Sequence, residues 1–214
     1  MRRSAAACWC ELIRAAIHTI LYIHHVYPRD TFQRCPRHGI SVYYCTSPVV
    51  QDYIDRLVED IEYWMTTKKQ QVSIRISISS SLEKKQVCYQ LELPPMDGWI
   101  ENNNNNSCTL VENLLQWQHI FREVIYRLLY VGPSLLSDDV VSPPTFQIFV
   151  RRSYLERAQD NETRWNQISL LLPFQQHNKH DEERWQALYS FPWNTTNPEQ
   201  CFSLFCFSRA NGET

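Results

Sequence analysis

Histidine and cysteine side chains that could hold a zinc ion gather in one short segment of the sequence. The candidate ligands are His24, His25, Cys35, His38 and Cys45. Structural zinc sites combine two closely spaced ligand pairs, and no second closely spaced cysteine pair supports the Cys35-x-x-His38 spacing. The competing interpretation is a solvated basic loop of Arg29, Arg34, Arg37 and His38. We predict no metal site, and a zinc-dependent enzyme stays an alternative that a metal assay can test.

Other patterns of enzyme chemistry are missing from the sequence. The four glycines, at positions 39, 98, 132 and 212, are too scattered for a phosphate-binding loop. The motifs G-x-x-x-x-G-K, G-x-G-x-x-G and G-x-S-x-G are absent. A His-x-x-His pair at 177 to 180 and acidic pairs at 138–139 and 182–183 lie in polar stretches. We therefore predict a protein that is not an enzyme, with no catalytic residues and no cofactor.

Composition and charge limit the classes of partner. A chain of 214 residues with 43% hydrophobic residues can bury a core as one domain. The formal net charge of -2 provides no general basic field, so we expect no direct binding to nucleic acid. Glu11 and Arg14 interrupt the longest apolar run, and we expect no membrane span. The eight cysteines are an even number that would suit a secreted protein, but a chain of this size needs no disulfides, and we favour reduced, intracellular cysteines.

Three segments have the apolar spacing of amphipathic helices. The first carries a stripe from Trp9 to Ile23 and is expected to end at Tyr27, because Pro28 disfavours helical geometry there. The second starts at Ser47 and Pro48, with Ser47 as the N-cap, and is expected to end near residues 68 and 69. The third spans about residues 109 to 131 and, because its apolar face is wide, is expected to be the most buried.

Alternating apolar and polar residues predict strands at 72–79 and 87–93, which form an antiparallel hairpin. β-Branched and aromatic residues predict a short strand at 40–45, and a further strand is expected at 145–152. Residues 29–39 look like a polar connector. Helices segregated from a mostly antiparallel sheet give an α+β fold. The last 60 residues differ, because long polar spacers separate three apolar runs at 165–174, 184–193 and 201–208. We interpret them as a tail that adds strands to an existing core.

Several sequence words within this layout resemble the HORMA-domain family. They are AIHTILY (16–22), VYP (26–28), FQ (32–33), SPVVQDYI (47–54), PP (94–95), TFQIFV (145–150) and FPW (191–193). The resemblance spans about residues 9 to 152, and beyond that rests on FPW and a final strand. It implies an α+β HORMA fold with three helices packed on a mainly antiparallel sheet. It also implies a single domain over 1–214, with a core at about 5–152 and a C-terminal safety belt at about 153–214.

The resemblance implies a non-catalytic adaptor whose safety belt holds an extended peptide against the sheet edge. The words look most like the branch of the family that serves translesion DNA polymerase zeta. The implied partner is therefore a proline-containing peptide of the polymerase zeta catalytic subunit, with a Y-family polymerase scaffold and a HORMA-HORMA dimer as further partners. The implied location is the nucleus, with the cytoplasm as a second location. The alternative is a spindle-checkpoint or meiotic chromosome-axis HORMA protein that clasps a different peptide.

The family pattern matches four positions of this sequence with implied roles. Tyr53 and Trp193 match aromatic residues that contact the partner peptide, and Tyr27 is a third position of that kind. Arg122 falls where the family has an arginine used in HORMA-HORMA dimerisation. Ordinary packing is the alternative for each of the aromatic residues. The stretch between Trp193 and Cys201 is shorter than in the polymerase branch, so we assign no residues for a second polymerase.

Overall fold

The computed structural model describes residues 5–68, 70–79, 85–93, 107–131, 144–154, 166–168, 186–194 and 197–210. The helices are α1 (Ala5–Ile23), η1 (Arg29–Thr31, a 3-10 turn), α2 (Pro48–Thr66) and α3 (Ser107–Val131). The strands are β1 (Phe32–Arg37), β2 (Ile40–Cys45), β3 (Gln70–Ser79), β4 (Lys85–Glu92), β5 (Thr145–Tyr154), β6 (Asn166–Ile168), β7 (Gln186–Asn194) and β8 (Asn197–Ala210).

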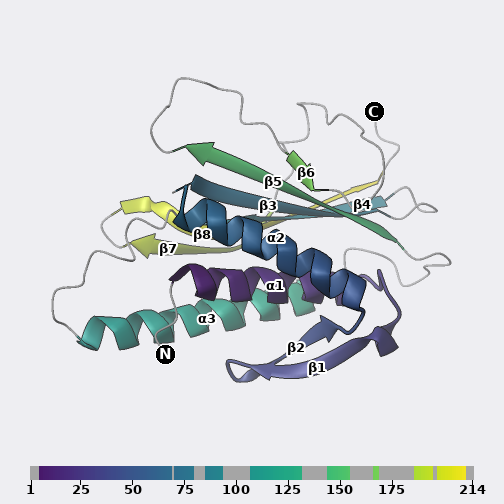
Figure 1. Cartoon of the computed structure of the whole chain (residues 1–214), viewed down its shortest axis with the longest axis horizontal. Coiled ribbons are helices and arrows are strands. Elements are labelled where there is room, and N and C mark those ends of the chain that lie inside the picture. The colour runs from purple at the N-terminus through teal and green to yellow at the C-terminus, as the bar shows by residue number, and fades with distance from the viewer. Residues whose placement is uncertain are drawn as a thin grey trace.

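The three long helices form one layer and a six-stranded sheet forms the other (Figure 1). The sheet order is β6-β5-β3-β4-β8-β7, and each neighbouring pair is antiparallel. Strands β1 and β2 make a separate two-stranded hairpin beside the helices. This arrangement confirms the α+β class predicted from the segregated helices.

Among the residues whose burial is described, helix α1, and not α3, is the most buried of the helices. It packs against α2, α3 and β2, so residues outside its main stripe are also covered, including Cys8, Leu12 and Leu21. Helix α3 instead exposes Leu115, Tyr126 and Tyr130. The prediction failed because a wide apolar face measures how much of a helix could be covered, whereas the number of neighbouring elements decides how much is covered.

Helix α1 also has the length and composition of a membrane span, contrary to our expectation, because its window contains only two charged residues, Glu11 and Arg14. Within this fold, however, 78% of the window Ala6–Ile23 is buried against other elements. The helix ends at Ile23 rather than Tyr27. His25 has a φ of 51°, a left-handed conformation, and the Val26 N–H donates to the Leu21 carbonyl at 3.1 Å. A left-handed residue of this kind closes many helix C-termini.

Helix α2 begins at Pro48 with Ser47 as its N-cap, as predicted. The Ser47 side chain makes no capping hydrogen bond; instead, the Gln51 side chain reaches back and donates to the Cys45 carbonyl at 2.8 Å. The helix stops at Thr66, two residues before the predicted lysines. The face towards the core carries Val50, Ile54, Leu57, Val58, Ile61 and Met65.

The segment expected to be a polar connector contains a strand. Phe32–Arg37 pairs with Ile40–Cys45, and His38 (φ 48°) and Gly39 (φ 82°) make the two-residue turn between them. Two consecutive positive φ values are the signature of a type I′ hairpin turn. The sequence did not indicate β1 because four of its six residues are exposed, so it has no alternating apolar pattern, and because it contains Pro36. Proline is tolerated in an edge strand because that strand has an unpaired side.

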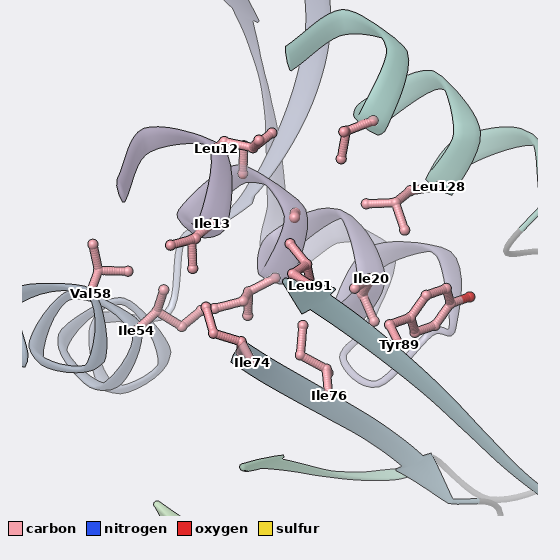
Figure 2. Packing of buried hydrophobic residues seen from close by; sticks show 14 of the residues in the cluster. Leu12, Ile13, Ile20, Ile54, Val58, Ile74, Ile76, Tyr89, Leu91 and Leu128 are labelled. Carbon is pink, nitrogen blue, oxygen red and sulfur yellow. The ribbon is translucent and has the colours of Figure 1, made fainter. Parts of the chain in front are cut away.

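The predicted central hairpin is confirmed, with β3 and β4 paired from Ser73↔Glu92 to Ser79↔Gln86. Its apolar face and the helices enclose the hydrophobic core, in which Ile20, Ile54, Ile74, Tyr89 and Leu128 come together from five elements (Figure 2). Burial of such side chains supplies most of the stabilising free energy of a fold of this size.

The tail contributes strands to both edges of the sheet. Strand β8 pairs along β4, and its Leu204 and Cys206 are buried in the same core. Strand β7 pairs with β8 and forms one outer edge. The short β6 pairs with β5 at the opposite edge. The prediction that the tail adds strands to an existing core is therefore confirmed for these three runs, although β6 is much shorter than the run that contains it.

Candidate functional site

An aromatic cluster lies where β5 begins, formed by Tyr27, Tyr53 and Phe146. The ring centroids of Tyr27 and Phe146 are 6.2 Å apart at an interplanar angle of 69°. The centroids of Tyr53 and Phe146 are also 6.2 Å apart, at 68°. Both contacts have the edge-to-face geometry that the quadrupoles of aromatic rings favour. The structure therefore brings together two of the predicted peptide-contact residues around a third ring.

Each ring is placed by a different element. Tyr53 lies on α2 beside the buried Ile54, and Tyr27 follows the left-handed turn that ends α1. Phe146 lies opposite Ile78 in the pairing of β5 with β3, on the face that the helices cover. All three rings are only partly buried and pack against the core. The cluster therefore has a supported inner side and an outer side that a ligand can reach.

Both tyrosines of the cluster are neutral phenols, and burial raises the pKa of each further above its ordinary value. Desolvation raises the pKa of Tyr53 to about 12, with a smaller contribution from Tyr27. Burial likewise raises the pKa of Tyr27. A neutral phenol can donate and accept a hydrogen bond while its ring packs against apolar groups. The cluster therefore suits an apolar side chain followed by a backbone polar group.

Within the described part of the chain, the edge of β5 next to this cluster has few backbone partners. Among the residues that the structure describes, β3 pairs with β5 along its whole length, while on the other side β6 covers only Ile148, Phe149 and Val150. Strand β5 has 10 residues and β6 has 3. In an antiparallel sheet, alternate residues of an edge strand direct their N–H and C=O groups outward. The β5 edge can therefore accept a further extended chain.

Trp193 lies elsewhere in the sheet. It belongs to β7, the outermost strand at the edge opposite β6, next to an irregularity in pairing between Pro192 and Asn194. Strands β3, β4 and β8 separate β7 from β5 in the sheet order. The structure therefore does not bring the strand of Trp193 beside Tyr27 and Tyr53, and its predicted role in peptide contact stays a prediction.

Arg122 lies on α3 among the exposed residues of that helix. Its Nε donates to the Gln118 carbonyl at 3.2 Å, and its side chain is partly buried. Leu115 and Tyr126, seven residues before it and four after it, are exposed on the same face of the helix. Arg122 therefore lies next to exposed apolar side chains, and its role in a dimer stays a prediction.

The candidate zinc ligands occupy separate environments in the folded chain. His24 hydrogen-bonds to Tyr89 at 2.7 Å, and the His25 ring contacts Arg29. His38 hydrogen-bonds to Glu11 at 3.2 Å and packs edge-on against Trp117. No group of three potential ligands comes together within the described part of the chain. The sequence cluster therefore does not form a shared site there.

Comparisons with known proteins point to one fold. No family model matches the chain. The mitotic spindle assembly checkpoint protein MAD2A of Mus musculus is 28% identical over 85 residues, which is 40% of each chain. The DNA polymerase zeta processivity subunit of Schizosaccharomyces pombe is 26% identical over 87 residues, 40% of this chain and 41% of that protein. The matches thus span about two fifths of these relatives' lengths.

Solved structures extend the similarity over nearly the whole chain. A chain of a mitotic checkpoint complex superposes with a TM-score of 0.56 at 16% identity, covering 95% of this chain and 97% of that one. C. elegans HTP-2 bound to a HIM-3 closure motif gives a TM-score of 0.53 at 10% identity, covering 96% and 90%. This chain has the HORMA fold. The HORMA fold expected from the sequence words is confirmed.

Within the HORMA fold of this chain, Phe146 is the cluster residue that sequence reasoning missed. It lies inside the word TFQIFV, which carried part of the resemblance. The sequence held no signal that its ring would meet both tyrosines, because Tyr27 and Tyr53 are far from it along the chain. Only the packing of α2 and the end of α1 over the start of β5 creates the cluster.

Proposed function

We propose that this HORMA-domain protein is a non-catalytic adaptor that holds an extended peptide of a partner along the β5 edge. The carrying observation is that the β5 edge, beside the ring cluster of Tyr27, Tyr53 and Phe146, pairs with only three residues of β6 among the described residues. A peptide strand added there gains backbone hydrogen bonds from β5 and side-chain contacts from the rings. HTP-2, which shares the fold, was solved with a closure motif bound.

The position of the tail supports this proposal. The hairpin of β7 and β8 pairs with β4, so it occupies the edge opposite β5 and leaves the β5 side to a partner. The tail also supplies β6 at the β5 edge. A tail anchored at both edges can retain a bound peptide, which is the role of a safety belt.

The partner that we propose is the catalytic subunit of translesion DNA polymerase zeta, through a proline-containing peptide. Similarity to the polymerase zeta processivity subunit of S. pombe supports it, and proline suits the cluster because its ring packs on aromatic faces. The protein would then act in DNA damage tolerance in the nucleus, with a Y-family polymerase scaffold and a HORMA-HORMA dimer through Arg122 as further contacts.

A checkpoint or chromosome-axis adaptor is the second candidate. The sequence similarity to mouse MAD2A is about as high as that to the polymerase zeta subunit of S. pombe. A chain of the mitotic checkpoint complex also shares the fold. The fold and the β5 edge would be the same in both cases. The identity of the bound peptide distinguishes the two functions.

The test is a pull-down from nuclear extract with three forms of the full chain. Wild type is compared with the variant Tyr53→Ala, Phe146→Ala and with the control Tyr130→Ala, whose tyrosine is 80% exposed on α3. Recovery of a B-family polymerase by wild type and the control, and its loss with the double variant, supports the proposal. Because Tyr53 and Phe146 pack against the core, Tyr53→Phe serves as a milder second variant, with thermal melts to verify folding.

Recovery of checkpoint or axis proteins in the same pattern would replace the polymerase function with the second candidate. Equal recovery by wild type and both cluster variants, with folding intact, would remove the β5 edge from the proposal. Trp193→Ala is measured alongside, because its strand lies at the other edge. Loss of the partner with this variant would assign β7 to the site.

A further inference from the structure

A second exposed surface, separate from the β5 edge, combines stacked aromatic rings with arginine side chains. It is formed by Tyr22 at the end of α1, Arg29 in η1, and Phe32, Arg34 and Tyr43 on the β1-β2 hairpin. We call it the arginine–tyrosine surface. It lies beside the helical layer, on the hairpin that projects away from the six-stranded sheet (Figure 1).

The tyrosine rings of this surface hold one another in place. Tyr22 stacks on Tyr43 with centroids 3.8 Å apart and planes within 5°. Phe32 meets Tyr22 edge-on at 5.4 Å and 70°. Stacked and edge-on rings restrict each other's side-chain rotation. The aromatic side chains of this surface are therefore held in one arrangement.

Two arginines border the rings. The Arg29 guanidinium lies 5.7 Å from the centroid of Tyr22, and its Nη2 is 3.1 Å from the His25 ring. Arg34 lies directly opposite Tyr43 in the hairpin register, so both project from the same face. Cation–π contact and hydrogen bonding to His25 limit the rotamers of Arg29, which lowers the entropy lost when it binds an anion.

Among the described residues, no carboxylate neutralises the charge of these arginines. Arg29 and Arg34 are both exposed, and within the described residues no carboxylate lies within ion-pair distance of either. The Glu11 carboxylate is taken by His38, with Arg37 3.9 Å away. Residues 24–45 contain three arginines and one aspartate, a formal charge of +2 in a chain of net charge -2. This surface is thus locally cationic.

We propose that the arginine–tyrosine surface binds an acidic segment, rich in aspartate and glutamate, of a second protein partner. Guanidinium groups make paired hydrogen bonds to carboxylates, and the stacked phenols, which hydrogen-bond to each other, add a neutral donor. Nucleic acid is disfavoured because Tyr22 and Tyr43 stack on each other, so their facing sides cannot receive a base. The surface is distinct from the β5 edge, so the two partners can bind together.

The test measures binding of a short fluorescein-labelled peptide of alternating glutamate and serine to the full chain by fluorescence anisotropy. The variant Arg29→Gln, Arg34→Gln is expected to lose roughly tenfold or more in affinity, because each charged hydrogen bond contributes appreciably. The control Lys68→Gln, Arg127→Gln removes the same charge on α3 and after α2, and is expected to bind like wild type. The glutamine version of the peptide is expected not to bind.

A charge exchange gives an independent check. The variant Arg29→Glu, Arg34→Glu should bind a lysine–serine peptide that wild type does not bind. Equal loss with the control variant would show an effect of net charge alone and overturn the proposal. Tighter binding of an oligothymidylate, lost in the double variant, would reassign the surface to nucleic acid. Self-association lost in the double variant would reassign it to a second copy of the chain.

The proposal for the arginine–tyrosine surface can fail independently of the proposed function of the β5 edge. Neither arginine contacts the ring cluster of Tyr27, Tyr53 and Phe146 in any described interaction. The pull-down of the β5-edge partner should therefore be unchanged in the double arginine variant. Loss of that partner in this variant would overturn the separation of the two surfaces.

Discussion

His24 and Tyr89 share a hydrogen bond of 2.7 Å in the core, between the end of α1 and the middle of β4. Both side chains are buried, and the Tyr89 ring is fully covered. The bond links the helical layer to the sheet, since the two residues are 65 positions apart in the chain. Nε2 of His24 thereby gains a partner that water cannot supply at this depth.

Removing the Tyr89 hydroxyl is expected to destabilise the fold. Tyr89→Phe leaves His24 Nε2 without its partner, and an orphaned buried polar group costs about 1 to 3 kcal/mol. Urea unfolding followed by circular dichroism measures the change. Tyr130→Phe is the matched control, because Tyr130 is 80% exposed, and it should change the unfolding free energy by less than about 0.5 kcal/mol. Equal stability of Tyr89→Phe and wild type would mean that this bond contributes nothing.

Stability is expected to fall as the solution becomes acidic. Burial lowers the pKa of His18 and of His24 from 6.5 to about 4 in each case. Between these values the unfolded chain binds protons that the folded chain does not, so stability is complete above pH 6.5 and decreases as pH falls toward 4. At about pH 5 the loss is about 2 kcal/mol per histidine.

Urea unfolding at neutral pH and at about pH 5 measures this loss. His24→Gln should retain only the part of the pH dependence that comes from His18. A wild-type stability that stays constant over this range would contradict the neutral, buried state of both histidines.

The turn of the β1-β2 hairpin depends on Gly39. Its φ of +82° is unfavourable for a residue with a Cβ, while an added Cβ would meet no atom within 4 Å. Gly39→Ala should therefore cost about 1 to 2 kcal/mol through backbone strain alone. Gly39→Asn should cost less, because asparagine tolerates the left-handed region. Thermal melts of the two variants check the order, and a larger loss with asparagine would point to a steric cause.

Phe146 is expected to matter for partner binding as well as stability. Phe146→Ala removes the ring that Tyr27 and Tyr53 both contact, so affinity for a β5-edge peptide should fall at least about tenfold. Tyr130→Ala, at a position 80% exposed on α3, is the control and should bind normally. Titration calorimetry with the peptide recovered in the pull-down measures both. Unchanged affinity of a folded Phe146→Ala protein would exclude the cluster from the site.

Local patterns in the sequence were enough to predict the long helices and the central hairpin. The stripe on α2 and the alternation in β3 and β4 record which face is buried, and the Ser47-Pro48 pair marks where α2 begins. The polar strand β1 escaped prediction, because Arg34 and Pro36 give it no alternating apolar face. Its only local signal was the His38-Gly39 pair, which suits a two-residue turn.

The sequence by itself determined the α+β class, the three helices and a tail of separate strands, because the periods of 3.6 and 2 residues are local properties of helices and strands. Only the tertiary structure decided that the tail strands divide between the two edges of the sheet, that β6 is the only described partner on the outer side of β5, and that the Phe146 ring meets both Tyr27 and Tyr53. These relationships join residues far apart in the chain, and their choice depends on which packing of the whole chain has the lowest free energy.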